Sequence, residues 1–218
     1  MMKKFLMLAL AACFAFAAQA VTLNWTIGKN ESVTNKRVSN PIEGTSCNSA
    51  SFAILVTFHT SDIPNNVDIA RMANWGNSDY IKAFGENNDV GFNTPKGNDA
   101  WSEAVPPVQA GQSYLFSMVY TKQDNGDIVL TCYVDNTKVH TTTFAGGLTG
   151  LEMNITAPTD ASVYTIEGAT AYHGTLREDE IAKMAANKTT DIFSVPEPTA
   201  LALLALGVAG LALRRKMA

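Results

Sequence analysis

Basic residues are scarce in the middle of this chain, and their scarcity excludes one large class of partner. The 218 residues contain 16 Lys and Arg against 20 Asp and Glu. Two of the basic residues lie in residues 1–20 and three in residues 199–218, and neither stretch contains an acidic residue. The body between them therefore carries 11 basic and 20 acidic side chains, a net charge of −9. Because nucleic-acid binding requires a basic surface, we expect no nucleic-acid partner.

Cysteine and histidine are also rare, with three of each. The sequence has no Cys/His spacing of the kind that holds zinc, no Ser/His/Asp motif and no phosphate-binding loop, so we expect a protein that is not an enzyme. His59, His140 and His173 are isolated, and a surface or packed role is expected for each. Cys47 and Cys132 form an even pair, which predicts one disulfide in an oxidising compartment. The alternative is that Cys132 is a buried strand residue without a disulfide.

Residues 1–20 have the three parts of a secretory signal peptide. A basic start is followed by an apolar run, and Ala18 and Ala20 provide the small residues of a cleavage site. A competing interpretation is a lipoprotein cleavage box that ends at Cys13, which would then be acylated. The apolar residues after Cys13 favour the ordinary signal peptide, so the mature chain is expected to begin near Val21.

The C-terminal end of the chain has the order of a segment that is held in a membrane. It begins with a rigid polar tripeptide, Pro196, Glu197 and Pro198. An apolar run follows at residues 199–213, and a basic stop that includes Arg214 and Arg215 follows at residues 214–216. As a helix the apolar run would span about 22 Å, which is short of the roughly 30 Å hydrocarbon core of a bilayer. The basic stop predicts a cytoplasmic C-terminus. The alternative, a buried C-terminal core helix, would need a polar face, which this run lacks.

This order of residues resembles the PEP-CTERM protein-sorting signal. The resemblance implies export, transient anchoring in the inner membrane by the C-terminal helix, and processing by an exosortase-type sorting machinery. It also implies that the domain then becomes associated with the cell surface or the extracellular matrix. The signal says nothing about the biochemical activity of the domain that it sorts.

Strand patterns dominate the body of the chain, which at about 175 residues has the size of one domain with its own core. Phe52, Ile54, Val56 and Phe58 share one face of the strongest strand by its period of two. Residues 30–48 are polar and predict a loop or an irregular edge, and residues 94–111 predict a long connection. The expected strands are residues 21–27, 51–59, 68–74, 80–84, 90–92, 113–121, 128–135, 138–144 and 162–172.

A tight turn and one helix complete the prediction. Asn125 and Gly126 tolerate the positive φ that a hairpin between residues 113–121 and 128–135 needs. Thr175 and Glu178 have the spacing of a capping box, which predicts a helix from that point to about Asn187. Its buried side should consist of Ile181, Met184 and Ala185.

Two segments resemble the laminin-G-like domains of the concanavalin A type. In the first, a long strand leads to a hairpin with the sequence Tyr133-Val134-Asp135, a turn, and Lys138-Val139. The second is residues 166–181, a last strand followed by a helix with Leu176, Glu180 and Ile181 at the family's spacing. The resemblance covers roughly residues 50–188 and implies a jelly roll. Two departures from the family pattern are Asn136, where glycine is usual, and Ser113-Tyr114, where tryptophan often begins the strand.

We therefore expect an all-β fold, a two-sheet antiparallel jelly-roll sandwich of the concanavalin A type with one short C-terminal helix. The expected organisation is a signal peptide at residues 1–20 and a laminin-G-like jelly-roll domain at residues 21–190. Residues 191–218 are expected to form a linker and the sorting segment, with a transmembrane helix at residues 199–213.

Candidate ligand-binding residues come from two predicted loops. Trp75 and Trp101 lie in these loops among Asn77, Asp79, Asn98 and Asp99, and an aromatic plate beside amide and carboxylate groups can stack on a sugar ring and bind its hydroxyls. The alternative is that both tryptophans cap the ends of the hydrophobic core. Oxygen ligands for Ca²⁺ are offered by a separate group whose spacing matches no recognised loop, Asp62, Asn65, Asn66 and Asp68. No other cofactor is expected.

These observations predict an exported, non-catalytic β-sandwich module that contacts carbohydrate, such as an extracellular polysaccharide. The alternative from another class is a structural or adhesive surface protein without a small ligand. A glycoside hydrolase is less favoured, because no expected strand has the alternating carboxylates that would place a catalytic pair about 5 Å apart. The acidic residues 178–180 are explained by the first turn of a helix.

Overall fold

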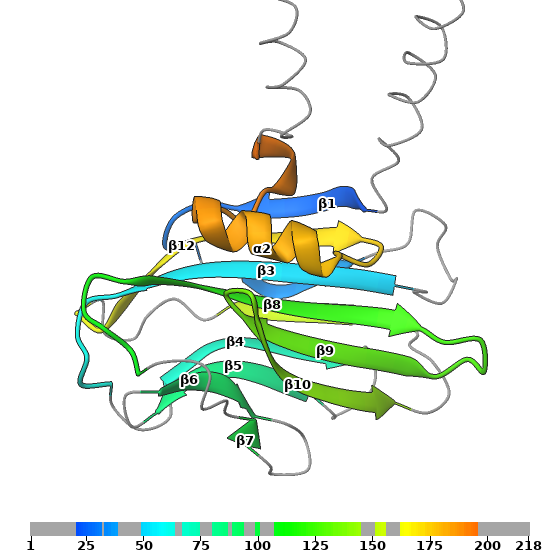
Figure 1. Ribbon diagram of the computed structural model, residues 1–218, viewed down its shortest axis with the longest axis horizontal. Coiled ribbons are helices and arrows are strands. Elements are labelled where there is room, and N and C mark those ends of the chain that lie inside the picture. Colours follow the sequence, from blue (N-terminus) through cyan, green and yellow to red (C-terminus); the bar gives the residue numbers. More distant parts are fainter. Residues whose placement is uncertain are drawn as a thin grey trace, which may run out of the picture.

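Two six-stranded antiparallel sheets form the body of the protein (Figure 1). The computed structural model describes residues 21–31, 33–38, 49–63, 67–74, 80–86, 89–93, 99–100, 107–144, 151–155 and 162–195. The first sheet, in spatial order, consists of β1 (Thr22–Ile27), β12 (Tyr164–His173), β3 (Ser49–Phe58), β8 (Ser113–Lys122), β9 (Ile128–Val134) and β10 (Thr137–Phe144). The second consists of β2 (Val33–Val38), β11 (Leu151–Ile155), β4 (Val67–Asn74), β5 (Tyr80–Glu86), β6 (Asp89–Asn93) and β7 (Asp99–Ala100).

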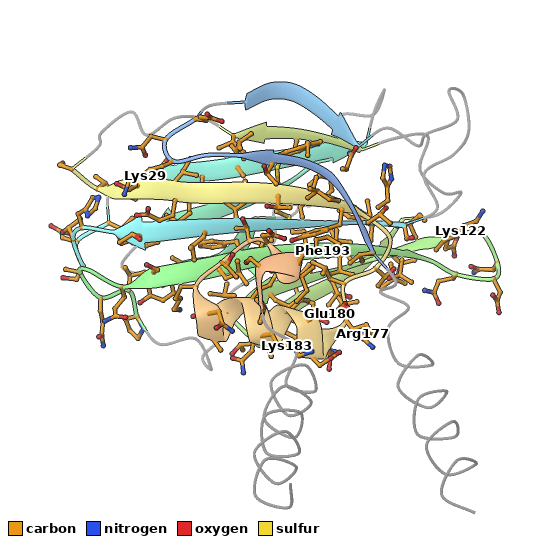
Figure 2. All side chains as sticks on the ribbon, turned by 90° about the horizontal axis from the view of Figure 1, so that it is seen from above. Lys29, Lys122, Arg177, Glu180, Lys183 and Phe193 are labelled. Carbon is orange, nitrogen blue, oxygen red and sulfur yellow. The ribbon has the colours of Figure 1, made fainter. Side chains whose placement is uncertain are left out.

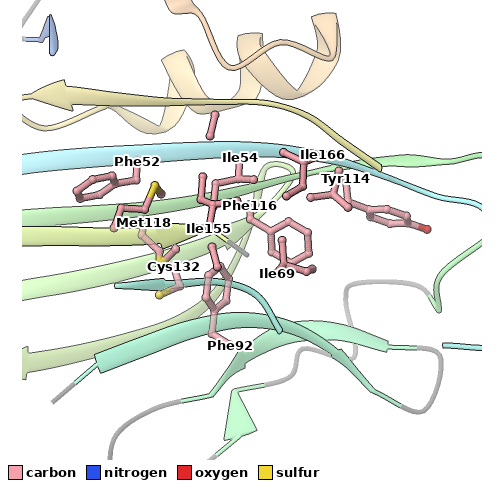
Figure 3. Close-up of a cluster of buried hydrophobic side chains, with 14 of the residues drawn as sticks. Phe52, Ile54, Ile69, Phe92, Tyr114, Phe116, Met118, Cys132, Ile155 and Ile166 are labelled. Atoms are coloured by element: carbon pink, nitrogen blue, oxygen red, sulfur yellow. The ribbon is translucent and has the colours of Figure 1, made fainter. Parts of the chain in front are cut away.

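The main core lies between the two sheets, where side chains of β3, β8, β9 and β12 meet those of β4, β6 and β11 (Figure 3). Phe92 on β6 packs edge-on against Phe116 on β8, with ring centroids 5.9 Å apart. The predicted apolar face of β3 is confirmed, because all four of its side chains belong to this core: Phe52, Ile54, Val56 and Phe58. The packing of the two sheets is therefore that of a β-sandwich.

A second apolar cluster covers the outer face of the first sheet. The helix α2 (Glu178–Asn187) lies there, with its predicted side of Ile181, Met184 and Ala185 buried. Beneath it, Leu55 and Leu115 point away from the main core and into this cluster. The strands β3 and β8 are thus covered on both faces, which explains why their sequences are apolar at nearly every position.

The predicted start of the helix is wrong by two residues. Arg177, not Thr175, precedes α2, and its backbone N–H donates to the side chain of Glu180 at 2.8 Å. The cause is Leu176, whose side chain is buried and whose N–H donates to Ser51 Oγ on β3 at 2.8 Å. This bond holds the chain against the sheet, so the helix begins only after it.

All nine predicted strands are confirmed to within two residues at each end, and the structure adds three more. The polar segment predicted as a loop or irregular edge contains β2, an edge strand. The segment between the expected strands 138–144 and 162–172 contains β11, and the long connection before β8 contains β7. In the turn between β9 and β10 the left-handed residue is Asp135, with φ 51°, not Asn136. The Asp135 carboxylate accepts a bond from the Leu115 N–H at 3.0 Å, which fixes that turn on β8.

The two ends of the chain lie outside the described residues. These ends include the predicted signal peptide with Ala18 and Ala20, and the sorting residues Pro196, Glu197, Pro198, Arg214 and Arg215. Among the residues that are described, none belongs to a helix long and apolar enough to cross a membrane.

Candidate functional site

The structure places none of the four predicted ligand-binding residues, because Trp75, Asn77, Asp79 and Trp101 lie outside the described residues. Asn65 and Asn66 of the predicted Ca²⁺ group lie outside them as well. Asp62 is exposed, and its backbone N–H donates to Thr60 Oγ1 at 3.0 Å. Within the described ranges no group of three or more His, Cys, Asp or Glu side chains is arranged to hold a metal ion.

A hollow of about 380 Å³ on the outer face of the first sheet is the candidate site that the structure adds. We call it the polar groove. It lies where β3, β8 and β12 meet the segment that follows α2, and its walls are mostly polar. It is lined by Leu55, Thr57, Ser113, Glu167, Gly168, Lys188, Thr189 and Thr190.

An irregularity in β12 creates one wall of the polar groove. The register of β12 against β3 shifts between Ile166 and Gly168, so Glu167 is an extra residue that bulges from the strand. The Glu167 carboxylate forms an ion pair with Lys29 Nζ at 2.9 Å. At Gly168 a side chain would begin 3.3 Å from the Ile27 carbonyl oxygen, so a residue without a side chain keeps the strands close and the groove open.

The opposite wall depends on how α2 ends. Lys188 adopts a left-handed conformation, with φ 49°, and its N–H bonds back to the last turn of the helix. The Lys188 ammonium donates to the Ser113 carbonyl at 2.8 Å and lies 3.2 Å from Asp135 Oδ1. These contacts fix the segment 188–190 over the sheet, although Lys188 itself is about half exposed.

Hydroxyl groups make up much of the remaining lining, and each is held in place by a partner. Thr57 Oγ1 and Ser113 Oγ are 2.8 Å apart, and Thr170 Oγ1 donates to Thr190 Oγ1 at 2.9 Å. A hydroxyl has one donor and two acceptor positions, so groups that make one such bond retain capacity for a ligand. The polar groove thus presents oriented hydroxyls together with one carboxylate and one ammonium.

Sequence reasoning did not find the polar groove, although two signals were available. A glycine in the interior of a strand marks a bulge or a close backbone approach, and Gly168 has that position. The sequence Lys188-Thr189-Thr190 after a helix is a polar cluster that marks a loop. Neither signal shows that β12 and this loop meet across the outer face of the sheet.

The three histidines lie apart from one another and outside the polar groove. His59 Nε2 is 2.7 Å from Thr165 Oγ1, and His140 Nε2 is buried without a hydrogen-bond partner. Burial lowers the pKa of both His140 and His173, which favours the neutral imidazole in each. His59 is exposed, and His140 and His173 are half-buried.

Cys132 is completely buried in the main core, and no disulfide joins it to another described residue. Burial raises its pKa, so the reactive thiolate is strongly disfavoured in the folded protein. Its predicted partner Cys47 lies outside the described residues, and the disulfide stays a prediction.

We expect maleimide to leave Cys132 unmodified in the native protein. In guanidinium, without a reductant, maleimide should modify it, and the intact mass of the protein would show the difference. Peptide mapping assigns the modified residue. Failure of the unfolded, non-reduced protein to react would instead establish the pairing with Cys47.

The chain leaves the domain beside the polar groove, through a short 3₁₀ helix, η1 (Ile192–Ser194). The hydroxyl of Tyr172 on β12 donates to the Thr190 carbonyl and accepts the Ile192 N–H at 3.0 Å. Asp191 Oδ1 accepts the Phe193 N–H at 2.9 Å, and the Ile192 side chain is buried. We call this set of contacts the Tyr172 clasp; it fixes the chain on the outer face of the sheet up to Ser194.

Residues 194–216 match the family model of the PEP-CTERM protein-sorting motif. The motif begins at the last residue of η1, so the sorting segment starts where the Tyr172 clasp ends. It marks the protein as exported and as anchored transiently before processing, with an exosortase-type sorting machinery as its processing partner. The predicted sorting signal is therefore confirmed.

Comparison of the whole sequence with curated proteins finds no match. Among solved structures, a Trypanosoma rangeli sialidase in complex with the inhibitor DANA is 13% identical, with a TM-score of 0.48, 63% of this chain covered and 22% of that one. A heptameric SAP-like pentraxin from Limulus polyphemus is 10% identical, with a TM-score of 0.41 and coverages of 72% and 82%. Domain 4 of AbnA, a GH43 extracellular arabinanase from Geobacillus stearothermophilus, in complex with arabinotriose, is 16% identical, with a TM-score of 0.40 and coverages of 65% and 68%. The chain spans about a fifth of the length of the sialidase, and similarity at this level assigns no function.

Proposed function

We propose that this protein is an exported, non-catalytic jelly-roll module that reaches the cell surface or the extracellular matrix and binds carbohydrate in the polar groove. The sorting motif supports the export of the domain. The two antiparallel sheets and the helix α2 support a jelly roll, the fold that the resemblance to laminin-G-like domains implies. The observation that carries the binding proposal is the set of oriented hydroxyls on β3, β8 and the segment 188–190.

The polar groove has the chemistry that a sugar requires. Sugar hydroxyls both donate and accept hydrogen bonds, and the groove offers groups of both kinds at fixed positions, from Thr57 and Ser113 on one side to Thr189 and Thr190 on the other. Its volume falls within the range of small-molecule sites, about 300–1,000 Å³. Because the hydroxyls are already held by neighbours such as Thr170, little conformational freedom would be lost when a ligand binds.

The number of carboxylates that line the polar groove favours sugar binding over glycoside hydrolysis. Among the described residues that line it, Glu167 supplies the carboxylate, and Lys29 binds that group at 2.9 Å. A retaining glycosidase needs two carboxyl groups about 5–5.5 Å apart, one of them protonated to act as the acid. The ion pair with Lys29 holds the Glu167 carboxylate in place, and a carboxylate accepts hydrogen bonds from sugar hydroxyls.

We expect the exported protein to be retained by at least one polysaccharide in a pull-down, and Glu167→Gln to weaken that binding at least tenfold. The substitution keeps the size of the side chain and removes the charge that orders Lys29 and accepts sugar hydroxyls. The matched control is Lys138→Gln, an exposed residue on β10 at the far edge of the same sheet. Dissociation constants from calorimetry would measure the difference.

The tryptophan variants separate the two sugar sites under consideration. If Trp75→Ala and Trp101→Ala abolish binding while Glu167→Gln leaves it unchanged, the loops predicted from the sequence hold the sugar and the polar groove does not. If no polysaccharide is retained by the wild-type protein, the carbohydrate proposal fails as a whole.

The second candidate function is a structural or adhesive surface protein without a small ligand. The feature that favours it is β10, an edge strand of the first sheet that exposes Thr141 and Thr143. An edge strand can pair with a second copy of the chain. Concentration-dependent self-association in sedimentation velocity, absent when Thr142 is replaced by proline, would favour this function over sugar binding.

A further inference from the structure

The point where the chain leaves the domain is also where apolar surface is exposed. Among the side chains that the structure describes, the two large hydrophobic ones that are exposed are Leu23, at 49%, and Phe193, at 45% (Figure 2 labels Phe193). Both belong to the outer face of the first sheet, and we call them together the exit patch.

The two residues are neighbours through Tyr172. Leu23 on β1 pairs directly with Tyr172 on β12, and paired residues in antiparallel strands point to the same face. The Phe193 ring packs against the Tyr172 ring, with the two ring centroids 6.2 Å apart. An irregularity of β1 between Leu23 and Trp25 explains why Leu23 is on this face, because Trp25 belongs to the core on the opposite face.

Both ends of the described domain meet at the exit patch. Val21, the expected first residue of the mature protein, is buried in the same apolar cluster as Tyr172 and Ile192. The domain therefore begins and ends within one small region, and that region exposes Leu23 and Phe193.

The sequence limits how far this region can lie from the membrane. Val195 is the last described residue, and the apolar run begins at Thr199. Four residues span at most about 14 Å even when fully extended. The headgroup layer on each side of the hydrocarbon core accounts for about 5–8 Å of that length. While the tail is in the bilayer, the surface around Val195 is therefore held against the lipid headgroups.

We propose that the exit patch is a membrane contact, in which Leu23 and Phe193 enter the interface of the bilayer while the tail is anchored. Large apolar side chains are stabilised at the boundary of headgroups and acyl chains. The Tyr172 clasp keeps η1 from extending the tether, so the domain is held with one defined face toward the lipid. This contact keeps Val195, which lies directly before the Pro-Glu-Pro tripeptide of the sorting motif, at the interface of the bilayer. The proposal rests on the sorting motif and not on the proposed sugar binding.

Site-specific labelling of the full chain in vesicles tests the contact. An environment-sensitive fluorophore is attached to Leu23→Cys or Phe193→Cys in a Cys47→Ser background, with vesicles of phosphatidylcholine and phosphatidylglycerol. The matched control is Thr141→Cys, an exposed strand residue on β10 at the opposite edge of the first sheet. We expect blue-shifted emission and quenching by nitroxide lipids at positions 23 and 193, and aqueous behaviour with iodide quenching at position 141.

Equal iodide quenching at all three positions would overturn the proposal. Protection of positions 23 and 193 that appears only after an exosortase is added would also overturn it, since the patch would then bind a protein. As a second measurement, the Leu23→Ser/Phe193→Ser double variant should make a label at the exposed Thr26 at least twofold more accessible to iodide in vesicles. No change at Thr26 would contradict the contact.

Discussion

Replacing Phe116 by alanine is expected to lower the free energy of unfolding by about 3–5 kcal/mol, the usual cost of removing a large aromatic side chain from a core. Phe116 is completely buried in the main core, and its ring packs edge-on against Phe92 of the opposite sheet. The substitution removes the apolar contacts of one sheet with the other and leaves a cavity between two rigid layers. Because strands pair within their own sheets, the surrounding backbone has little freedom to close that cavity.

Urea unfolding followed by circular dichroism would measure this effect. Thr141→Ala on β10 is the matched control, and as an exposed strand substitution it should change the stability by no more than about 0.5 kcal/mol. Phe116→Leu should fall between the two, because it retains most of the apolar volume. A loss below about 1 kcal/mol for Phe116→Ala would mean that the two sheets do not pack through this side chain.

The strands of the first sheet could be predicted because burial imposes a pattern on their sequence. On β3 the inward side chains Phe52 to Phe58 alternate with Ala53 and Leu55, which α2 covers. A strand buried on both faces must be apolar throughout, so its sequence identifies it. The tight turn at Gly126 could be predicted for a similar reason, since its φ of 89° requires a residue without a side chain.

The strand β2 left no comparable pattern, whereas β11 left a short one, because Leu151, Met153 and Ile155 alternate with polar residues. β2 is an edge strand with the sequence Val-Thr-Asn-Lys-Arg-Val, and β11 is five residues long. Short or polar strands pair through their backbones, and backbone pairing is independent of side-chain type. The start of α2 was misplaced because the bond from Leu176 to Ser51, 125 residues away in sequence, decides where the helix begins.

The polar groove could not be predicted because its parts come together only in the folded chain. Glu167 is distant in sequence from Thr57 and Ser113, and the segment that follows α2 reaches the sheet through Lys188, which is left-handed and directly follows the helix. The sorting motif is the opposite case. It acts as a linear signal, so the sequence alone contained all of it.

Replacing Tyr172 by phenylalanine is expected to lower the free energy of unfolding by about 2–3 kcal/mol, since a buried group that loses its hydrogen-bond partner costs about 1–3 kcal/mol. The ring remains in place, and only the hydroxyl that binds the Thr190 carbonyl and the Ile192 N–H is removed. Burial raises the pKa of Tyr172, so the phenol stays protonated and able to donate throughout the physiological range.

Tyr133→Phe is the matched control, because Tyr133 lies under α2 on the same face and its hydroxyl reaches Glu178 at 3.3 Å, at the exposed start of the helix. Water can replace that bond, and the expected loss is below about 1 kcal/mol. The Tyr172 clasp should therefore distinguish the two variants in urea unfolding.

Limited proteolysis connects the Tyr172 clasp to sorting. We expect cleavage between residues 190 and 195 to be at least tenfold faster in Tyr172→Phe than in Tyr133→Phe, because only the first variant frees η1 from the sheet. Freed residues would lengthen the tether from four residues to about nine, or roughly 31 Å at full extension. The domain would then no longer be held at the bilayer surface. Equal cleavage rates of the two variants would show that Tyr172 does not hold η1 on the sheet. The tether to the membrane would then be longer than four residues, and the argument that the exit patch is held at the lipid would fail.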